Sequence, residues 1–296
     1  MAEVPKSFAR ARSDFDALVG PMRPRLHRYC AGLTGSVIDG EDVVQEAFAK
    51  AYYGLTNATV DNLEAWMFRI AHNAAMDHLR RKRLHDALIV EDDIERLIDD
   101  VVTPEAQDVA SYALGTFMHL PPRQRSCVLL KDVLGYSIAE IADLIDASPA
   151  AVKASLHRGR QHLRDLAKDP VDKPTAALSE PERSLLTAYV EHFNARNFDA
   201  IRAMLAEEVR LEIAGGRGGG QGKREVGGYF TRYEAVDDWH FVPGTVEGRP
   251  AALAYDPTKK SDPPIYFVLL TWRDGLLCDI RDFRYARYVA ALAEYG

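Results

Sequence analysis

Two helix-start signals lie close together near the middle of this 296-residue chain, and they constrain its fold more than any other feature. Ser137 and Glu140 form a capping box, in which the two side chains satisfy free backbone amides at the start of a helix. The apolar stripe that follows ends at Ile145, and only Asp146 and Ala147 separate it from Ser148 and Pro149, which form an N-cap with proline at the first helical position. Two short helices joined by so tight a turn predict a helix-turn-helix.

The second helix of this motif has an apolar face and a basic face. The apolar face holds, at helical spacing, Val152, Leu156, Leu163 and Leu166. The basic face holds Lys153, His157, Arg160 and Arg164, with Arg158 offset from them. Such a helix fits the major groove of DNA, where it reads base edges and contacts phosphates. A solvated basic face on an ordinary helical hairpin is the alternative, but the two caps and the tight turn favour DNA binding.

A helix expected over residues 61–83 carries a second pattern typical of nucleic-acid binding. Beside its apolar stripe runs a mixed stripe of Trp66, Arg69, Asn73, Asp77 and Arg80, and the helix ends in the basic run 80–83. Aromatic side chains stack on unpaired bases and cations hold phosphates, so this stripe fits single-stranded DNA. Taken alone, it fits equally well a solvated face whose cations stabilise the helix C-terminus.

The formal net charge of −7, from 37 basic and 44 acidic residues, argues against a uniformly basic nucleic-acid binder. The excess is local, because residues 91–110 contain one basic and 8 acidic side chains, −7 net. The segments 1–90, 111–169 and 170–296 sum to +1, +2 and −3. We therefore expect DNA binding on particular helices, and an acidic connector that competes with DNA for them or threads a basic channel of a partner.

The cysteines and the N-terminal stretch indicate the compartment. Cys30, Cys127 and Cys278 are scattered and lack C-x-x-C spacing, which predicts free thiols rather than disulfides or a zinc site. The first residues contain no apolar core of signal-peptide length, and the longest apolar runs are too short to cross a bilayer. We expect a cytoplasmic protein with no metal, no cofactor and no membrane contact.

Three motifs in a fixed order carry a resemblance to a known family. They are GEDVVQEAFAKAY (40–52), EAWMFRIAHNAAMDHLRRKR (64–83) and LPPRQRSCVLLKDVLGYSIAEIADLIDASPAAVKASLHRGRQHLRDL (120–166). Together they resemble bacterial RNA polymerase sigma factors of the extracytoplasmic-function type. The resemblance implies sigma domain 2 at 10–84, an acidic linker at 85–110, and sigma domain 4 with the helix-turn-helix at 111–168. It implies transcription initiation, with core RNA polymerase (the β′ and β subunits) and promoter DNA as partners.

The resemblance also implies roles for individual residues. The motif that docks on the polymerase β′ subunit corresponds to Asp42, Val43, Gln45, Glu46 and Phe48. The segment that opens and reads the minus-ten promoter element corresponds to Trp66, Arg69, Asn73, Asp77, Arg80 and Arg81. The helix that reads the minus-thirty-five element corresponds to Lys153, Ser155, His157, Arg158 and Arg160. For Asp42 and Glu46 a plain solvated pair at i, i+4 spacing is the alternative.

After a linker at 169–179, the C-terminal stretch 180–296 exceeds what such a sigma factor needs. Ser179 and Glu182 form another capping box, which predicts a helix through Asn194. A second helix is expected after it, over 198–206. Strands are expected at 209–213, 239–246, 251–255, 265–272 and 276–285, with a tight hairpin at Asp274-Gly275. Two helices before a curved antiparallel sheet, with AYVEHFNARNFDAIRAMLAEEVRLE at 188–212, resemble a SnoaL-like domain of the nuclear-transport-factor cone fold.

A glycine-rich stretch interrupts this domain. Eight of the 20 glycines fall in positions 215–228. Sigma factors with fused SnoaL-like domains often have a similar Gly-Gly-Gly-Lys motif, which implies a candidate regulatory loop at Gly218, Gly219, Gly220 and Lys223. A flexible loop between strands is the alternative. A phosphate-binding loop is disfavoured, because Arg224 follows Lys223 where that loop needs Ser or Thr.

The cone of such a domain can hold a ligand or perform acid–base chemistry. Candidate polar liners, each of which also fits a structural role, are His240, Tyr266, Asp279 and Asp282. The predicted fold is α+β and multidomain, with two all-α sigma domains followed by an α+β cone-shaped domain. The predicted function is that of a non-enzymatic sigma factor, without catalytic residues, which its C-terminal domain regulates in cis. The alternative is a DNA-binding regulator whose C-terminal domain senses a small-molecule ligand or is a cyclase- or isomerase-like enzyme.

Overall fold

A computed structural model of the chain describes residues 15–55, 60–86, 114–168, 177–215, 218–258 and 263–296. The acidic stretch 91–110 and the linker residues 169–176 lie outside the described residues. The chain divides into two compact units, Met1–Asp172 and Lys173–Gly296. The two units are described one at a time below.

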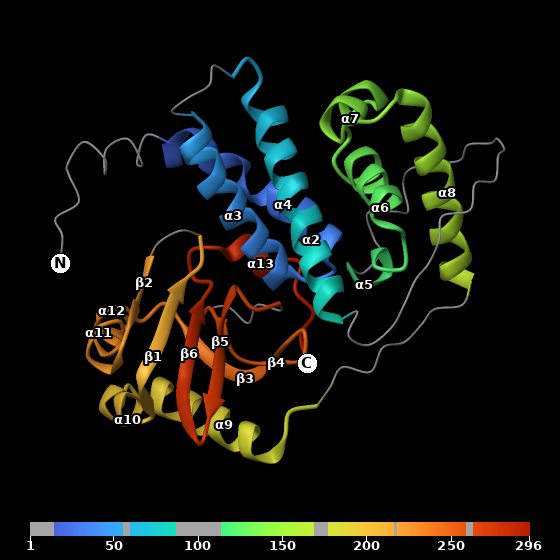
Figure 1. Cartoon of the computed structure of the whole chain (residues 1–296). Coiled ribbons are helices and arrows are strands. Elements are labelled where there is room, and N and C mark those ends of the chain that lie inside the picture. Colours follow the sequence, from blue (N-terminus) through green and yellow to red (C-terminus); the bar gives the residue numbers. More distant parts are fainter. Residues whose placement is uncertain (1–14, 56–59, 87–113, 169–176, 216–217, 259–262) are drawn as a thin grey trace. The chain divides into compact units, whose positions relative to one another are not determined.

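The described part of the first unit is built from helices (Figure 1). Its N-terminal part contains the short helix η1 (Gly20–Met22), α2 (Arg23–Thr34), α3 (Val37–Leu55) and α4 (Leu63–Asp86). Its second part contains α5 (Leu114–Phe117), α6 (Pro122–Val128), the π-helical turn η3 (Leu129–Val133), α7 (Ile138–Leu144) and α8 (Pro149–Lys168). The helices predicted from the capping signals are confirmed, and the π-helical turn is a feature that the sequence did not predict.

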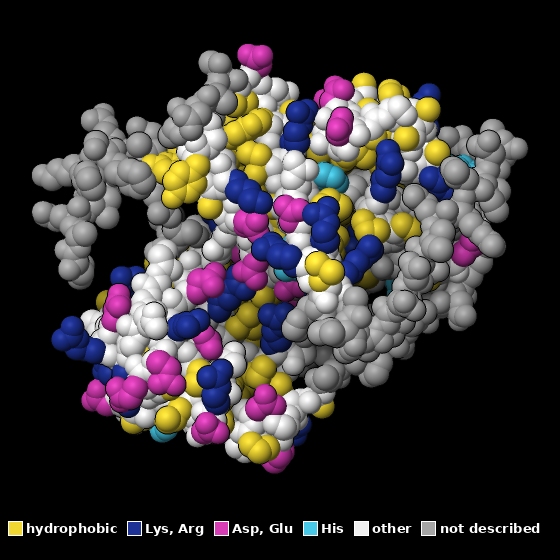
Figure 2. Space-filling view, in the orientation of Figure 1, with side chains coloured by type: hydrophobic (Ala, Val, Ile, Leu, Met, Phe, Trp, Pro, Cys, Tyr) yellow, Lys and Arg dark blue, Asp and Glu magenta, His cyan; other side chains and the backbone are white. Residues whose placement is uncertain are grey.

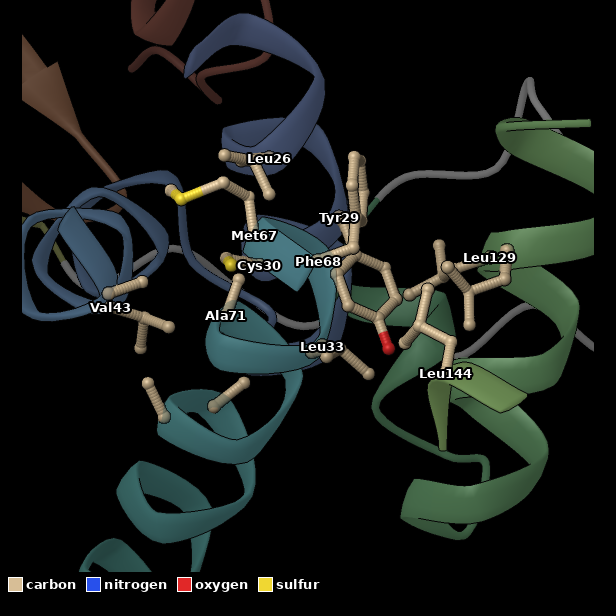
Figure 3. Close-up of a cluster of buried hydrophobic side chains, with 14 of the residues drawn as sticks. Leu26, Tyr29, Cys30, Leu33, Val43, Met67, Phe68, Ala71, Leu129 and Leu144 are labelled. Atoms are coloured by element: carbon tan, nitrogen blue, oxygen red, sulfur yellow. The ribbon is translucent and has the colours of Figure 1, made fainter. Parts of the chain in front are cut away.

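One buried apolar cluster runs through both parts of this unit (Figure 3). Leu26 and Tyr29 of α2 and Phe68 of α4 belong to the same cluster as Leu129 of η3 and Leu144 of α7. Cys30 and Cys127 are buried free thiols, as the sequence predicts, and burial raises the pKa of Cys127 to about 11. The two parts of the first unit therefore share a core, which places their functional helices against one another.

The second unit is an α+β domain. Its helices are α9 (Glu180–Asn194), α10 (Phe198–Ala203), α11 (Lys223–Gly227), α12 (Phe230–Glu234) and α13 (Arg287–Ala290). Its strands are β1 (Leu205–Ile213), β2 (Gly218–Gln221), β3 (His240–Val246), β4 (Arg249–Tyr255), β5 (Tyr266–Arg273) and β6 (Leu276–Asp282). The capping box at Ser179 and Glu182 opens α9 as predicted.

The strands form one sheet in the order β2-β1-β6-β5-β4-β3. The expected hairpin between β5 and β6 is confirmed, with positive φ angles at both Asp274 (52°) and Gly275 (77°). The expectation of a purely antiparallel sheet is wrong, because β1 pairs with β6 in parallel. The expected second helix is also shorter than predicted, since it ends at Ala203 and the chain is already extended at Leu205.

The core of the second unit is aromatic and is centred on Phe193 of α9. Six rings pack around Phe193 with centroid distances of 4.9 to 6.1 Å, and they belong to Tyr189, Phe198, Phe230, Tyr233, Trp239 and Phe241. Most of these pairs are edge-to-face, the arrangement that the ring quadrupole favours. The helices and the inner face of the sheet are thus joined by side chains that fill the cone.

We expect Phe193→Ala to lower the free energy of unfolding of this unit by about 3–5 kcal/mol, since it removes a 1% exposed ring and leaves a cavity. Urea unfolding followed by tryptophan fluorescence measures the change. Val242→Ala, at a 39% exposed position of β3, is the control and should shift the free energy by less than about 0.5 kcal/mol. Equal unfolding midpoints for the two variants would contradict this account of the core.

Candidate nucleic-acid and polymerase interface

The predicted helix-turn-helix is confirmed in α7 and α8. Ser137 donates its backbone amide to Glu140 Oε2 at 2.7 Å, and the Glu140 amide donates to Ser137 Oγ at 3.2 Å. Ser148 Oγ likewise accepts the amide of Ala151 at 3.2 Å and so caps α8. The turn between the helices contains Asp146 with a φ of 52°. Local capping therefore fixes where both helices begin.

The residues expected to read the minus-thirty-five element divide into two groups on α8. Lys153 is exposed, and His157 and Arg158 are half-buried at the surface. Ser155 is only 2% exposed and lies on the inner face, where its hydroxyl interacts with the Cys127 thiol. Lys153, His157 and Arg158 therefore lie on an accessible face of α8, and Ser155 does not belong to this face.

Arg160 is held by an ion pair within its own part of the unit. Its Nε donates to Asp132 Oδ2 at 2.9 Å and its Nη2 donates to Asp132 Oδ1 at 2.5 Å. The Asp132 side chain is fully buried and that of Arg160 is 19% exposed. The hydrogen bonds from Arg160 to Asp132 raise the pKa of Arg160 above its ordinary value. Sequence reasoning missed Asp132, since a single Asp after an apolar run carries no signal of its own.

The residues expected to read the minus-ten element lie along α4. Arg69, Asn73, Arg80 and Arg81 are exposed, and Trp66 and Asp77 are half-buried. They share one helix, so they can act together on a single strand of DNA. Several already have partners in the chain: Asp77 accepts from Arg80 at 2.9 Å, and Arg69 Nη2 donates to the Asp143 carbonyl of α7 at 2.9 Å.

The residues expected to dock on the polymerase lie on α3, in two layers. Asp42 is exposed, and Gln45 and Glu46 are half-buried at the surface. Val43 and Phe48 are buried and support the helix from inside. Burial alone would raise the pKa of Glu46, but the cations of Lys50 and Arg81 outweigh it and hold this pKa below its ordinary value. Arg81 Nη2 lies 2.9 Å from Glu46 Oε2, which links α3 to α4.

Polar contacts reinforce the shared core where α4 and α2 meet the second part of the first unit. Glu64 Oε1 accepts a hydrogen bond from Tyr136 Oη at 2.9 Å and pairs with Arg25. The ring of Tyr136 packs edge-on against Phe68, with centroids 5.3 Å apart. Burial, and then the hydrogen bond to Glu64, raises the pKa of Tyr136 above its ordinary value.

A buried arginine completes this contact. Arg125 of α6 is 3% exposed and donates to the Leu33 carbonyl of α2, and also to the carbonyls of Met118 and Leu120 at 3.1 and 2.9 Å. Burial lowers the pKa of Arg125 to about 10. Sequence reasoning missed Arg125, because arginine is usually exposed and nothing local indicates its burial.

The four polar residues expected to line the cone do not come together. Tyr266 and Asp282 lie inside it, whereas His240 is exposed and Asp279 lies on the opposite face of the sheet. Asp282 Oδ2 accepts from Tyr229 Oη at 2.7 Å and from Tyr233 Oη at 2.8 Å, and Oδ1 accepts the Arg284 amide. Burial raises the pKa of Asp282, while the two tyrosine hydroxyls act in the opposite direction.

The glycine-rich stretch forms an edge strand rather than a loop at Gly218, Gly219 and Gly220. Lys223 follows at the start of α11, with its Nζ 3.7 Å from Glu207 Oε1. A cavity of about 550 Å³ lies beside this strand. Its lining includes charged residues of the outer sheet face, among them Arg210, Glu212, Asp279 and Arg281.

None of the helices that the structure describes is long and apolar enough to cross a membrane. Within the same residues, no three His, Cys, Asp or Glu side chains gather in a way that could hold a metal ion.

Family models match the chain in three places. Sigma-70 region 2 matches residues 18–85, Sigma-70 region 4 matches residues 114–163, and the SnoaL-like domain matches residues 186–279. The matched ranges contain the helices and strands described above. The chain is therefore a sigma-type transcription factor with a C-terminal SnoaL-like domain, in agreement with the resemblance seen in its motifs.

Curated relatives narrow the class. The ECF RNA polymerase sigma factor SigG of Mycobacterium tuberculosis H37Rv is 30% identical over 275 residues, which cover 82% of this chain and 74% of SigG. SigW of Bacillus subtilis is 28% identical over 167 residues, which cover 52% of this chain and 89% of SigW. The crystal structure of M. tuberculosis SigJ covers 91% of this chain and 95% of SigJ, at 21% identity and a TM-score of 0.35. This chain belongs to the extracytoplasmic-function (ECF) RNA polymerase sigma factors.

Charge reversal at Glu64 tests the contact inside the first unit. We expect Glu64→Lys to repel Arg25 and to break the hydrogen bond from Tyr136, at a cost of about 1–3 kcal/mol. Spin labels at Tyr53→Cys and Lys153→Cys report the spacing by electron–electron resonance, because the native cysteines are buried. The distance distribution should broaden in Glu64→Lys and stay narrow in the control Asp61→Lys. Identical distributions in both variants would contradict a role for Glu64 in this contact.

Proposed function

We propose that this ECF sigma factor engages the polymerase through α3, opens and reads the minus-ten element through α4, and reads the minus-thirty-five element through α8. The observation that carries the proposal is the division of the exposed polar groups among these three helices. Acidic and amide groups gather on α3, an aromatic ring with cations and an amide on α4, and cations on α8. Each set suits its partner: protein, unpaired bases and duplex DNA.

The polymerase-docking surface consists of the side chains of Asp42, Gln45 and Glu46. Val43 and Phe48 act from within, since both are buried and hold α3 in the core. An acidic surface of this kind suits a cationic face on the β′ subunit, and the β subunit is the second expected partner in core polymerase. The polymerase and the chromosome share the bacterial cytoplasm, so the same proposal places the chain there.

Reversing the charge of Asp42 tests the docking surface. We expect Asp42→Lys to weaken binding to purified core polymerase about tenfold, because an exposed carboxylate at the interface becomes a repelling cation. Run-off transcription on a promoter library and a core-binding titration measure the effect. Glu208→Lys, an exposed change in the second unit, should leave both unchanged. Full core affinity in Asp42→Lys would contradict docking through this surface.

Promoter binding also depends on the contacts within the first unit. The guanidinium of Arg69, on the helix assigned to the minus-ten element, bonds to the Asp143 carbonyl of the helix-turn-helix. This bond uses one of the five N–H donors of an exposed guanidinium, so Arg69 keeps donors for a DNA strand while it stays in contact with α7.

The second unit acts in this proposal as a regulator and not as an enzyme. Both Asp282 oxygens already accept hydrogen bonds from the chain, and aromatic rings fill the cone around Phe193. Acid–base catalysis needs a carboxylate that a substrate can reach, so this packing supports regulation in cis over the enzyme alternative. The glycine strand with Lys223 remains the candidate regulatory element.

Removing the second unit tests regulation in cis. A chain shortened by deletion of residues 175–296 should differ at least threefold from the full chain in run-off transcription, with core affinity measured in parallel. The reason is that a domain regulating in cis must favour one state of the sigma helices, and its loss removes that bias. Unchanged output together with unchanged core affinity would reject the regulatory role while leaving the sigma function intact.

A further inference from the structure

One part-buried ion pair, between Arg160 and Asp132, joins α8 to the η3 turn. Asp132 and Arg160 form two parallel hydrogen bonds, of 2.9 and 2.5 Å, in the fork geometry that arginine makes with a carboxylate. The Asp132 side chain has no exposed surface, so no DNA atom can reach it. An acidic group this deep requires its cation, since an unpaired buried charge is strongly unfavourable.

The neighbouring residue shows how closely α8 lies on α6. A Cβ atom at Gly159 would come within 2.8 Å of Val128 Cγ2, so a larger residue there would force this buried side chain to shift. The absent side chain lets the two helices approach closely, and this approach brings Arg160 within reach of Asp132. The close approach at Gly159 and the ion pair therefore both hold α8 against the helices that precede it.

Asp132 belongs to a π-helical turn, which directs its side chain. The hydrogen bonds of the turn η3 (Leu129–Val133) span five residues, as in the bond from the Leu134 amide to the Leu129 carbonyl at 3.0 Å. Such turns insert an extra residue into a helix and shift the side chains that follow. Leu129 and Leu130 of this turn are buried, so the backbone that carries Asp132 is held by the core.

We propose that Arg160 is a positioning residue for promoter recognition, which acts through Asp132 by fixing the rotation of α8. This inference rests on the proposed role of α8 at the minus-thirty-five element. Lys153 and His157 lie on the same side of α8 as Arg160, at spacings of seven and three residues. A rotation of α8 by 10–20° would displace both side chains from the base edges they read.

The resemblance of this helix to promoter-reading helices gives Arg160 a direct DNA contact instead, and the two roles predict opposite effects at Asp132. If Arg160 bonded only to a phosphate, Asp132→Asn would remove a nearby negative charge and leave DNA affinity equal or higher. If Arg160 acts by positioning, the same change weakens the two parallel hydrogen bonds to Arg160, and the protein then discriminates less well among promoter sequences. The isosteric change at a residue that cannot touch DNA therefore separates the two.

The experiment uses the full chain with core polymerase on two templates, a promoter selected from a library and the same promoter with a scrambled upstream element. The readout is the ratio of transcripts from the two templates. Because each protein preparation is tested on both templates, the fraction of folded protein affects both transcript amounts equally and cancels from their ratio. We expect Asp132→Asn, Arg160→Gln and Arg160→Lys each to lower the ratio about tenfold, with no further loss in the double variant Asp132→Asn/Arg160→Gln.

Two matched variants complete the design. Arg202→Gln removes a half-buried arginine of α10 in the second unit, whose Nη2 donates to Glu234 Oε1 at 2.9 Å, and it should keep the ratio. Lys153→Gln removes an exposed cation and should reduce the salt dependence of promoter binding by about one unit of slope. Thermal unfolding of every variant shows how much of each protein is folded.

The outcomes distinguish the inference from the function on which it rests. An unchanged ratio in Asp132→Asn, together with a uniform loss on both templates in Arg160→Gln, would overturn positioning in favour of a direct phosphate contact. Retention of the full ratio in Arg160→Lys would overturn it too, since lysine keeps the charge but cannot form the fork. A wild-type chain that fails to distinguish the two templates would overturn the role of α8 itself.

Discussion

The buried guanidinium of Arg125 is the interaction on which the arrangement of the first unit depends. It bonds to the Leu33 carbonyl near the C-terminal end of α2, where free carbonyls and the helix dipole both favour a cation. It also donates hydrogen bonds to the carbonyls of Met118 and Leu120 in the segment before α6. A cation can be buried so deeply only where several acceptors surround it, so its presence fixes α6 against α2.

The remaining contacts of that unit follow from this placement. With α6 against α2, the π-helical turn brings Leu129 into the shared core, and α7 comes to rest on α4, where Arg69 meets the Asp143 carbonyl. Cations of α4 are thus paired inside the chain, as Arg81 is with Glu46. Positive and negative side chains lie interspersed on the surface shown in Figure 2. The whole-chain charge of −7 is compatible with the proposed DNA binding, because that proposal places the DNA contacts on a few helices and not on the whole surface.

Local signals predicted much of the fold and part of the site. Capping boxes at Ser137 and Ser179 and the Asp274-Gly275 turn depend on residues close in sequence, so reading along the chain finds them. The parallel pairing of β1 with β6 and the burial of Arg125 arise from distant segments and left no local trace. The glycine strand β2 was missed because glycine disfavours strands, and here its pairing with β1 outweighs that preference. Ser155 was assigned to the DNA face by family position, whereas its place between Val152 and Leu156 turns it inward.

The packing of the second unit bears on why a cone-shaped domain accompanies sigma helices. Cones that perform catalysis need an interior open to a substrate and a titratable group aimed into it. Here Tyr229 and Tyr233 hold the Asp282 carboxylate, and Arg284 joins Tyr266 to Asp238. These bonds tie the segment that follows the glycine strand to β6. The Asp282 carboxylate is therefore already paired within the chain, and this packing favours the proposed regulatory role over catalysis.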